Sequence, residues 1–153
     1  MDLMSLAVEL LDRLPANRTL GLTIAELHNG LGRAVLPVSD GVRNVIGALH
    51  SSGVVALADA AALAAVLSAS PDEATARRLQ PLGVEARLSF RRPVRGTAIG
   101  TCVLDAQTRA AVENLFGGHA NQAGFTTRTT IDGDEAPEAA VGEFDWVVRL
   151  APS

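Results

Sequence analysis

The sequence has one cysteine, no lysine, no tyrosine and few aromatic residues of any kind. A single cysteine, Cys102, excludes a disulfide framework and a metal cluster built on cysteines. Because Cys102 lies in an apolar run, we expect it to be a small buried residue. No basic stretch precedes an apolar segment near the start, so no secretory signal is predicted and we expect a soluble, cytoplasmic protein. The all-arginine set of basic residues suggests a GC-rich, bacterial genome.

Positive charge is also scarce. The formal net charge is −4 and the pI is about 5.3, which argues against a nucleic-acid partner bound through its phosphates. The length of 153 residues suits one domain, or a subunit whose core a second copy completes. We therefore predict a single domain over 1–153, with no metal and no separate cofactor.

The pattern of apolar residues predicts the order of the elements. Leucines at helical spacing predict an N-terminal helix over 1–15 that ends at Pro15 and covers an apolar surface. Two apolar runs over 20–38, separated by Asn29-Gly30, predict a hairpin with a type I′ turn. After a polar loop over 70–81, alternation from Val84 predicts a half-buried antiparallel strand, the first of four over 83–150. An inserted helical segment is expected at about 105–118.

The segment 51–69 is apolar on every face, which is typical of a membrane span or of a helix at the centre of a fold. Asp59 lies in its middle, where a membrane insertion would cost roughly 2.5–3.5 kcal/mol, so we favour a central helix and expect no membrane association. Ser51 or Ser52 is the expected N-cap. Asp59 is either on one exposed stripe or faces a cavity as an acid or base with a raised pKa, and the apolar neighbours favour the cavity.

The loop before this helix contains Asn44, Gly47 and His50. The N-terminus of a helix presents free N–H groups and the positive end of its dipole, which can stabilise an oxyanion. Asn44 adds an amide donor to the same region. Taken singly, Asn44 would be a turn residue and His50 a structural hydrogen-bonding residue. Their position just ahead of Asp59 favours a catalytic site.

The order of elements is therefore helix, two strands, buried helix and four strands. The segment from Asn44 through Gly47 and His50 to Asp59 resembles the signature of hotdog-fold acyl-CoA thioesterases of the phenylacetyl-CoA thioesterase-like group, with matching spacing. Residues 90–96, Phe-Arg-Arg-Pro-Val-Arg-Gly, are similar to a later strand and turn of that family. The family's Gly-Gly after the histidine is Ser51-Ser52 here, and residues 105–122 are longer than its usual connection. The resemblance covers about 20–150 and implies an α+β hotdog fold, a curved antiparallel sheet wrapped around a long central helix.

The resemblance also implies roles for individual residues. Asn44 and the Ser51 N–H would polarise a thioester carbonyl, while Asp59 of the other subunit activates water as a general base or attacks the carbonyl directly. His50 shapes the loop, and Gly47 and Ser52 belong to the substrate-binding surface. The phosphates of the substrate, coenzyme A or a carrier protein's phosphopantetheine, are expected at a set of three arginines: Arg91, Arg92 and Arg95. A homodimer, or a tetramer of hotdog dimers, is expected.

Two other functions stay open. A hotdog dehydratase or hydratase would also use a histidine and an acid, although the sequence shows no separate Asp-and-His signature of that kind. A binding protein for acyl thioesters, without turnover, is favoured by Ser51-Ser52. A third arrangement keeps hydrolysis but makes Ser51 the nucleophile with His50 as its base.

Overall fold

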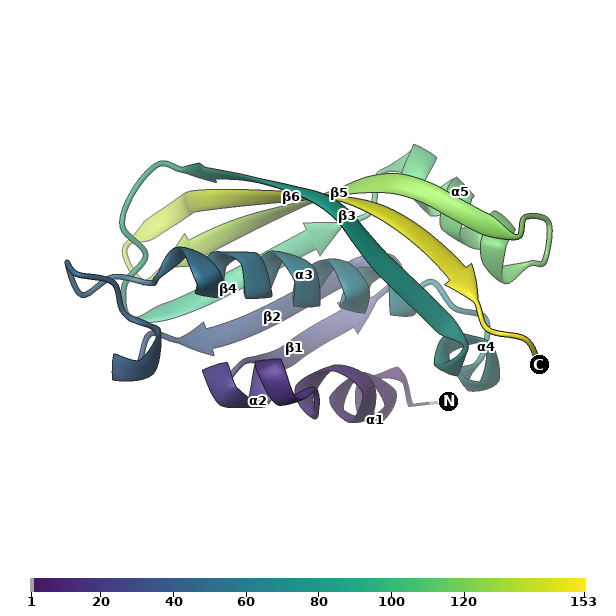
Figure 1. Cartoon of the computed structure of the whole chain (residues 1–153), viewed down its shortest axis with the longest axis horizontal. Coiled ribbons are helices and arrows are strands. Elements are labelled where there is room, and N and C mark those ends of the chain that lie inside the picture. The colour runs from purple at the N-terminus through teal and green to yellow at the C-terminus, as the bar shows by residue number, and fades with distance from the viewer. Residues whose placement is uncertain (1) are drawn as a thin grey trace.

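One long helix lies against a curved sheet of six antiparallel strands in the computed structural model, which describes residues 2–153 (Figure 1). The elements in chain order are α1 (Leu3–Ala7), the π-helical segment η1 (Val8–Asp12), α2 (Pro15–Leu20), β1 (Thr23–His28), β2 (Leu31–Pro37), the 3-10 turn η2 (Asp40–Val42), α3 (Ser51–Leu67), α4 (Glu73–Arg77), β3 (Leu79–Phe90), β4 (Thr97–Val103), α5 (Ala106–Phe116), β5 (Gln122–Gly133) and β6 (Ala136–Leu150). The mixed α+β architecture with a curved antiparallel sheet is confirmed.

The sheet has the strand order β1-β2-β4-β5-β6-β3, so β1 and β3 are its two edges. The β1–β2 hairpin turns at Asn29 and Gly30, whose φ angles are 47° and 79°. Both positions require a positive φ in a type I′ turn, and asparagine and glycine tolerate it best. Local chemistry therefore determines where this hairpin turns.

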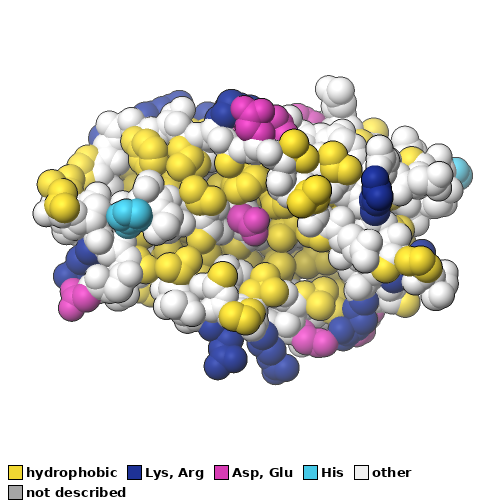
Figure 2. Space-filling view, viewed as in Figure 1, with side chains coloured by type: hydrophobic (Ala, Val, Ile, Leu, Met, Phe, Trp, Pro, Cys, Tyr) yellow, Lys and Arg dark blue, Asp and Glu magenta, His cyan; other side chains and the backbone are white. Residues whose placement is uncertain are grey.

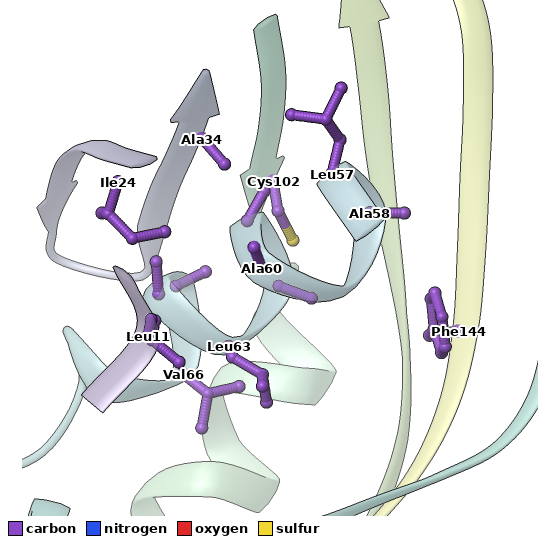
Figure 3. Close-up of a cluster of buried hydrophobic side chains, with 14 of the residues drawn as sticks. Leu11, Ile24, Ala34, Leu57, Ala58, Ala60, Leu63, Val66, Cys102 and Phe144 are labelled. Carbon is purple, nitrogen blue, oxygen red and sulfur yellow. The ribbon is translucent and has the colours of Figure 1, made fainter. Parts of the chain in front are cut away.

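The helix α3 lies within the segment 51–69 that the sequence assigned to it, and most of its residues are buried. Leu57 and Ala58 pack among side chains from β2, β4 and β6, whereas Leu63 lies on the side of Leu11 (Figure 3). Cys102 of β4 is fully buried in the same cluster, as expected, and burial raises the pKa of its thiol to about 11. Among residues 2–153, no helix combines the length and apolarity needed to cross a membrane.

Alanine on the helix and glycine on the strands let α3 approach the sheet closely. A Cβ at Gly32 of β2 would collide with the backbone of α3 at Ala61 and Ala65. A Cβ at Gly142 of β6 would lie 2.5 Å from the Cβ of Ala58. The sheet therefore needs glycine on both sides of the helix.

We expect Gly32→Ala to lower the free energy of unfolding by about 1–3 kcal/mol, because the helix backbone must move to admit the methyl group. Gly124→Ala is the matched control, since a Cβ there has no neighbour nearer than 3.9 Å and the site is also in a strand. Chemical denaturation of both variants measures the difference. Equal stability of the two variants would contradict the close approach.

The N-terminal segment differs from the single helix expected over 1–15. Asp2 accepts a hydrogen bond from the Met4 N–H and caps α1, after which the chain widens into η1. Pro15 begins α2 rather than only ending a helix, because a proline needs no N–H donor at a first helical position. The expected polar loop over 70–81 contains α4 and the first residues of β3.

The strand β3 is antiparallel, as predicted, and its one partner within residues 2–153 is β6, but it is not half-buried. Leu82, Val84 and Phe90 are 65%, 62% and 58% exposed. An alternating pattern predicts a half-buried strand only if another layer of the fold covers its apolar face. Because β3 is an edge strand, these apolar side chains stay largely uncovered within this chain. The apolar edge of β3 is therefore available for another molecule.

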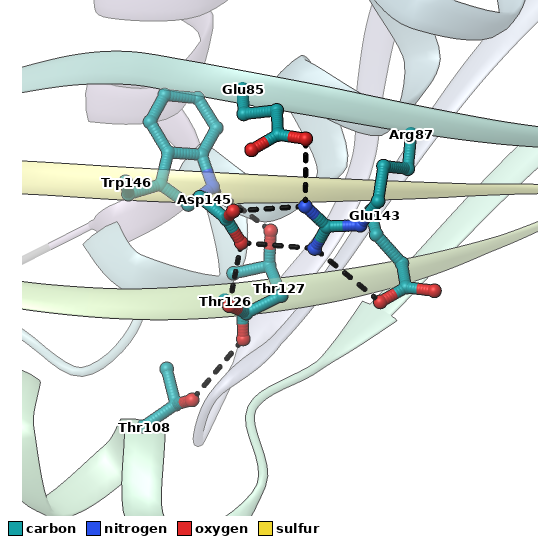
Figure 4. Close-up of polar contacts among 8 residues, drawn as sticks. All are labelled: Glu85, Arg87, Thr108, Thr126, Thr127, Glu143, Asp145 and Trp146. Carbon is teal, nitrogen blue, oxygen red and sulfur yellow. Dashed lines mark hydrogen bonds and ion pairs between the residues drawn. The ribbon is translucent and has the colours of Figure 1, made fainter.

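Next to that edge, charged side chains form a network across β3, β6 and β5 (Figure 4). Arg87 contacts Asp145 through two hydrogen bonds of 2.9 and 3.0 Å, and it lies 3.5 Å from Glu85 and 3.8 Å from Glu143. Thr126 donates a further hydrogen bond to Asp145. Arg87 and Thr126 together lower the pKa of Asp145 to about 2. These contacts hold the register of β3 against β6.

Candidate functional site

The loop before α3 is organised by Asn44. Its side-chain oxygen accepts hydrogen bonds from the N–H groups of Ile46 and Ala48, at 3.1 and 3.0 Å. Its backbone N–H donates to the Ala48 carbonyl, and its carbonyl accepts from the Gly47 N–H. The oxygen of the amide is thus used within the loop. The side-chain NH₂ group has no acceptor within residues 2–153, so it can donate to a ligand.

Gly47 adopts a φ of +75°, a left-handed conformation that favours glycine at this turn. Arg95 supports the same turn from the far side, because its guanidinium donates to the Ile46 carbonyl at 3.0 Å. The turn that positions Asn44 is therefore held by contacts both inside and outside the loop.

His50 is the N-cap of α3, where Ser51 or Ser52 was expected. Its Nδ1 accepts from the Ser52 N–H at 3.1 Å and lies 2.8 Å from the Ser52 hydroxyl. These contacts fix the His50 side chain at the start of α3. Since Nδ1 faces Ser52, it is not placed to act as a base for Ser51. The Ser51 N–H has no hydrogen-bond acceptor in the described part of the chain, so it is an open donor at the helix N-terminus.

Two open pockets border this loop, and Ser51 lines the larger one. One, of about 690 Å³, is lined by the loop and the end of β3: Arg43, Asn44, Val45, Leu49, His50, Ser51 and Phe90. A second, of about 360 Å³, shares Asn44, Leu49 and Phe90 and continues along Arg91 and Arg92. Asn44 and Phe90 therefore line both pockets.

Asp59 lies on the one stripe of α3 that keeps some exposure, together with Ser52, Val55 and Ala56. The stripe contradicts a fully enclosed cavity within one chain, yet apolar residues surround the carboxyl group. Burial raises the pKa of Asp59 to about 6, in the predicted direction, and no charged partner among residues 2–153 opposes the shift. Figure 2 shows this face of the molecule, where apolar side chains gather around an acidic side chain in a hollow.

The three arginines are placed near the loop but have their own contacts. Arg91 lies 3.3 Å from Glu138, and Arg92 donates to the Pro137 carbonyl. Arg95 supports the turn at Ile46. Arg91 and Arg92 line the second pocket, whereas Arg95 donates its hydrogen bond to the loop and does not line that pocket.

Within one chain, the structure brings Asn44, Gly47, His50 and Ser51 together but leaves Asp59 apart. Asp59 follows Ser51 by eight residues, which is about 12 Å along a helix. A site that uses both residues on one small group therefore needs a second copy of the chain.

Sequence reasoning did not identify Phe90 as part of the site. Its ring borders both pockets and is more than half exposed. The feature of the sequence that could have identified it is its position at the end of the alternating strand, directly before Arg-Arg-Pro. The alternation by itself predicts that Phe90 is a core residue.

Comparison with known proteins gives matches among solved structures only, since no protein-family model and no curated protein matches the chain. The probable thioesterase PA5026 of Pseudomonas aeruginosa, a protein of unknown function, is 23% identical over 95% of each chain, with a TM-score of 0.76. The thioesterase HI1161 of Haemophilus influenzae is 18% identical over 94% of this chain and 88% of its own, with a TM-score of 0.68. A mutant of the thioesterase PA1618 of P. aeruginosa is 15% identical over 98% and 95%, with a TM-score of 0.69. The chain shares the fold of these proteins.

Proposed function

We propose that the protein is a hotdog-fold enzyme that hydrolyses acyl thioesters. The observation that carries this proposal is Asp59, an acid with a raised pKa on an otherwise apolar helix. A general base works best when its pKa is near the working pH. The open Ser51 N–H and the free amide of Asn44 supply donors for an oxyanion. The fold shared with thioesterases supports the same chemistry.

The active site is formed between two subunits. Val55 lies halfway between Ser51 and Asp59, on the exposed stripe of α3. A two-fold axis beside Val55 and Ala56 brings Asp59 of each chain to the Ser51 of its partner, which creates two equivalent sites. These two residues are small and apolar, so the helices can approach closely. Pairing of β3 with the partner's β3 would cover its exposed apolar edge and continue the sheet.

In the proposed reaction, the thioester carbonyl accepts hydrogen bonds from the Asn44 amide and the Ser51 N–H. Asp59 of the partner takes a proton from water while the water oxygen bonds to the carbonyl carbon. The carbonyl electrons move to the oxygen, which the two donors stabilise. The C–S bond then breaks, and the leaving thiolate takes up the proton held by Asp59, which returns Asp59 to its carboxylate form. The products are a carboxylic acid and a free thiol.

Arg91 and Arg92 are proposed to bind the phosphates of coenzyme A or of a carrier protein's phosphopantetheine. Both border the pocket that continues from Asn44. Arg91 and Arg92 now contact Glu138 and the Pro137 carbonyl, which are both exposed. Exposed ion pairs contribute little free energy, so a phosphate can displace these contacts.

The proposal is tested with a panel of acyl-CoAs by following the release of free thiol. Thiol release that depends on Asp59 supports hydrolysis. Binding of acyl-CoA without thiol release would favour a binding protein, and hydration of an enoyl-CoA without thiol release would favour a hydratase. Mass spectrometry of the protein during turnover separates attack by water from an acyl-enzyme on Ser51.

We expect Asn44→Asp to lower kcat/KM by about 10²–10³, because the variant keeps the oxygen that organises the loop but loses the NH₂ donor. Ser51→Gly is the matched control, since it removes the hydroxyl and keeps the backbone N–H. It should keep most of the activity and can accept bulkier acyl groups. Steady-state kinetics of both variants tests the pair, and an inactive Ser51→Gly would contradict an oxyanion donor from the backbone.

A further inference from the structure

A further pocket, separate from the two at the loop, lies between the N-terminal helices and the C-terminal half of α3. Its volume is about 240 Å³. We call it the leucine pocket, because its walls are dominated by that residue: Leu10, Leu11, Leu14, Leu63, Leu67 and Leu79. Figure 3 shows Leu11 beside Leu63 of α3. Within residues 2–153, Arg77 is the only charged residue of the wall.

The charge of Arg77 is already neutralised. Its guanidinium forms two hydrogen bonds of 2.7 and 2.8 Å with Glu9 of η1, and it also contacts Glu73. Arg77 therefore joins η1 to α4 and contributes its apolar stem to the pocket. The wall on the other side is the π-helical segment η1, a conformation that is rare and often found at functional sites.

The leucine pocket lies along α3 from the proposed base. Leu63 follows Asp59 by one helical turn, about 6 Å, and Leu67 by two turns, about 12 Å. An extended chain advances about 1.2 Å per bond. A chain that starts at Asp59 therefore reaches the level of Leu67 after about ten carbon atoms.

We propose that the leucine pocket binds the distal part of an unbranched aliphatic acyl chain, and that the enzyme prefers acyl groups of about eight to ten carbons. This inference rests on the proposed function, which sets the position of the thioester. The preference for an aliphatic chain follows from the leucine walls of the pocket. An apolar cavity of about 150 Å³ binds benzene, so the 240 Å³ pocket has room for the roughly five distal carbons that lie beyond Leu63 in a ten-carbon chain. A charged or strongly hydroxylated acyl group would lose its hydration there without a partner.

The test measures the binding of S-alkyl coenzyme A thioethers, which cannot be hydrolysed, by calorimetry. In the unchanged protein, each added methylene from ethyl to decyl should strengthen binding by up to about fourfold, with no further gain at hexadecyl. Leu14→Trp, at a position 41% exposed, should weaken decyl binding at least tenfold by filling the pocket. Leu10→Ala should instead shift the optimum to longer chains.

Val103→Trp is the control, because Val103 is 61% exposed on β4 and lies outside the leucine pocket. Equal binding of ethyl and decyl thioethers, or the same profile in Leu14→Trp and Val103→Trp, would overturn the proposal. Hydrolysis of thioesters at rates independent of chain length would support the thioesterase proposal and contradict binding of the chain in the leucine pocket. Binding that depends on chain length, without hydrolysis of any thioester, would support the pocket and contradict the proposed thioesterase function.

Discussion

Asp59→Asn is expected to lower kcat for thioester hydrolysis by about 10²–10⁴, the usual contribution of a general base. The amide fills the same space but cannot accept the proton of water. In the unchanged enzyme, kcat/KM should rise with pH through about 6 and then level off, because the carboxylate is the active form. Initial rates between pH 4.5 and 8 measure this profile, which the variant should lack.

The same substitution should stabilise the fold, which separates a catalytic role from a structural one. The pKa of Asp59 is about 6 in the folded chain, above the 3.8 of an unperturbed carboxyl group. Ionisation therefore opposes folding: the cost is absent below pH 3.8, grows between pH 3.8 and about 6, and is complete above it. The difference corresponds to up to about 3 kcal/mol.

Thermal unfolding at two pH values reads this cost directly. Asp59→Asn should raise the Tm by several degrees at pH 7.5 and leave it nearly unchanged at pH 3.5. Glu135→Gln is a control at an exposed carboxylate that no step of the reaction uses. A variant that is both inactive and less stable at pH 7.5 would mark Asp59 as a structural residue instead.

Local chemistry explains what the sequence predicted well. A few adjacent residues determine the conformation of the Asn29-Gly30 turn and of α3, with its run of alanine, leucine and valine. Asp59 could be singled out for the same reason, since a lone acid in such a helix must be exposed, paired or shifted in pKa. The spacing from Asn44 to Asp59 placed the loop at the start of α3.

The features that the sequence did not reveal depend on contacts between distant segments. The exposure of β3 follows from its place at the sheet edge, which its alternating pattern does not encode. The leucine pocket is formed by η1, α3 and β3 together. Within each segment alone, its leucines have the spacing of ordinary core residues. His50 as N-cap was missed because serine usually takes that role, and here the imidazole nitrogen accepts the hydrogen bond.

Two inactive variants should restore activity when they are combined in one dimer, if each site takes Asp59 from one chain and Asn44 from the other. In a heterodimer of Asp59→Asn and Asn44→Asp chains, one site carries both substitutions. The other site carries neither, because its Asn44 and its Asp59 come from the chains that keep them. We therefore expect about half of the activity of the unchanged dimer, a gain of at least tenfold over either variant alone.

The measurement requires co-expression of the two chains with different affinity tags and two successive purifications. Each variant carrying both tag types is the control, and it should stay inactive. Val55→Glu in both chains tests the same arrangement from the other side, because two carboxylates beside the proposed two-fold axis repel each other and should produce monomers in light scattering. If Asp59 served its own chain, every site in the heterodimer would lack one group. The heterodimer would then be as inactive as its parents, and the shared site would be wrong even if both residues are catalytic.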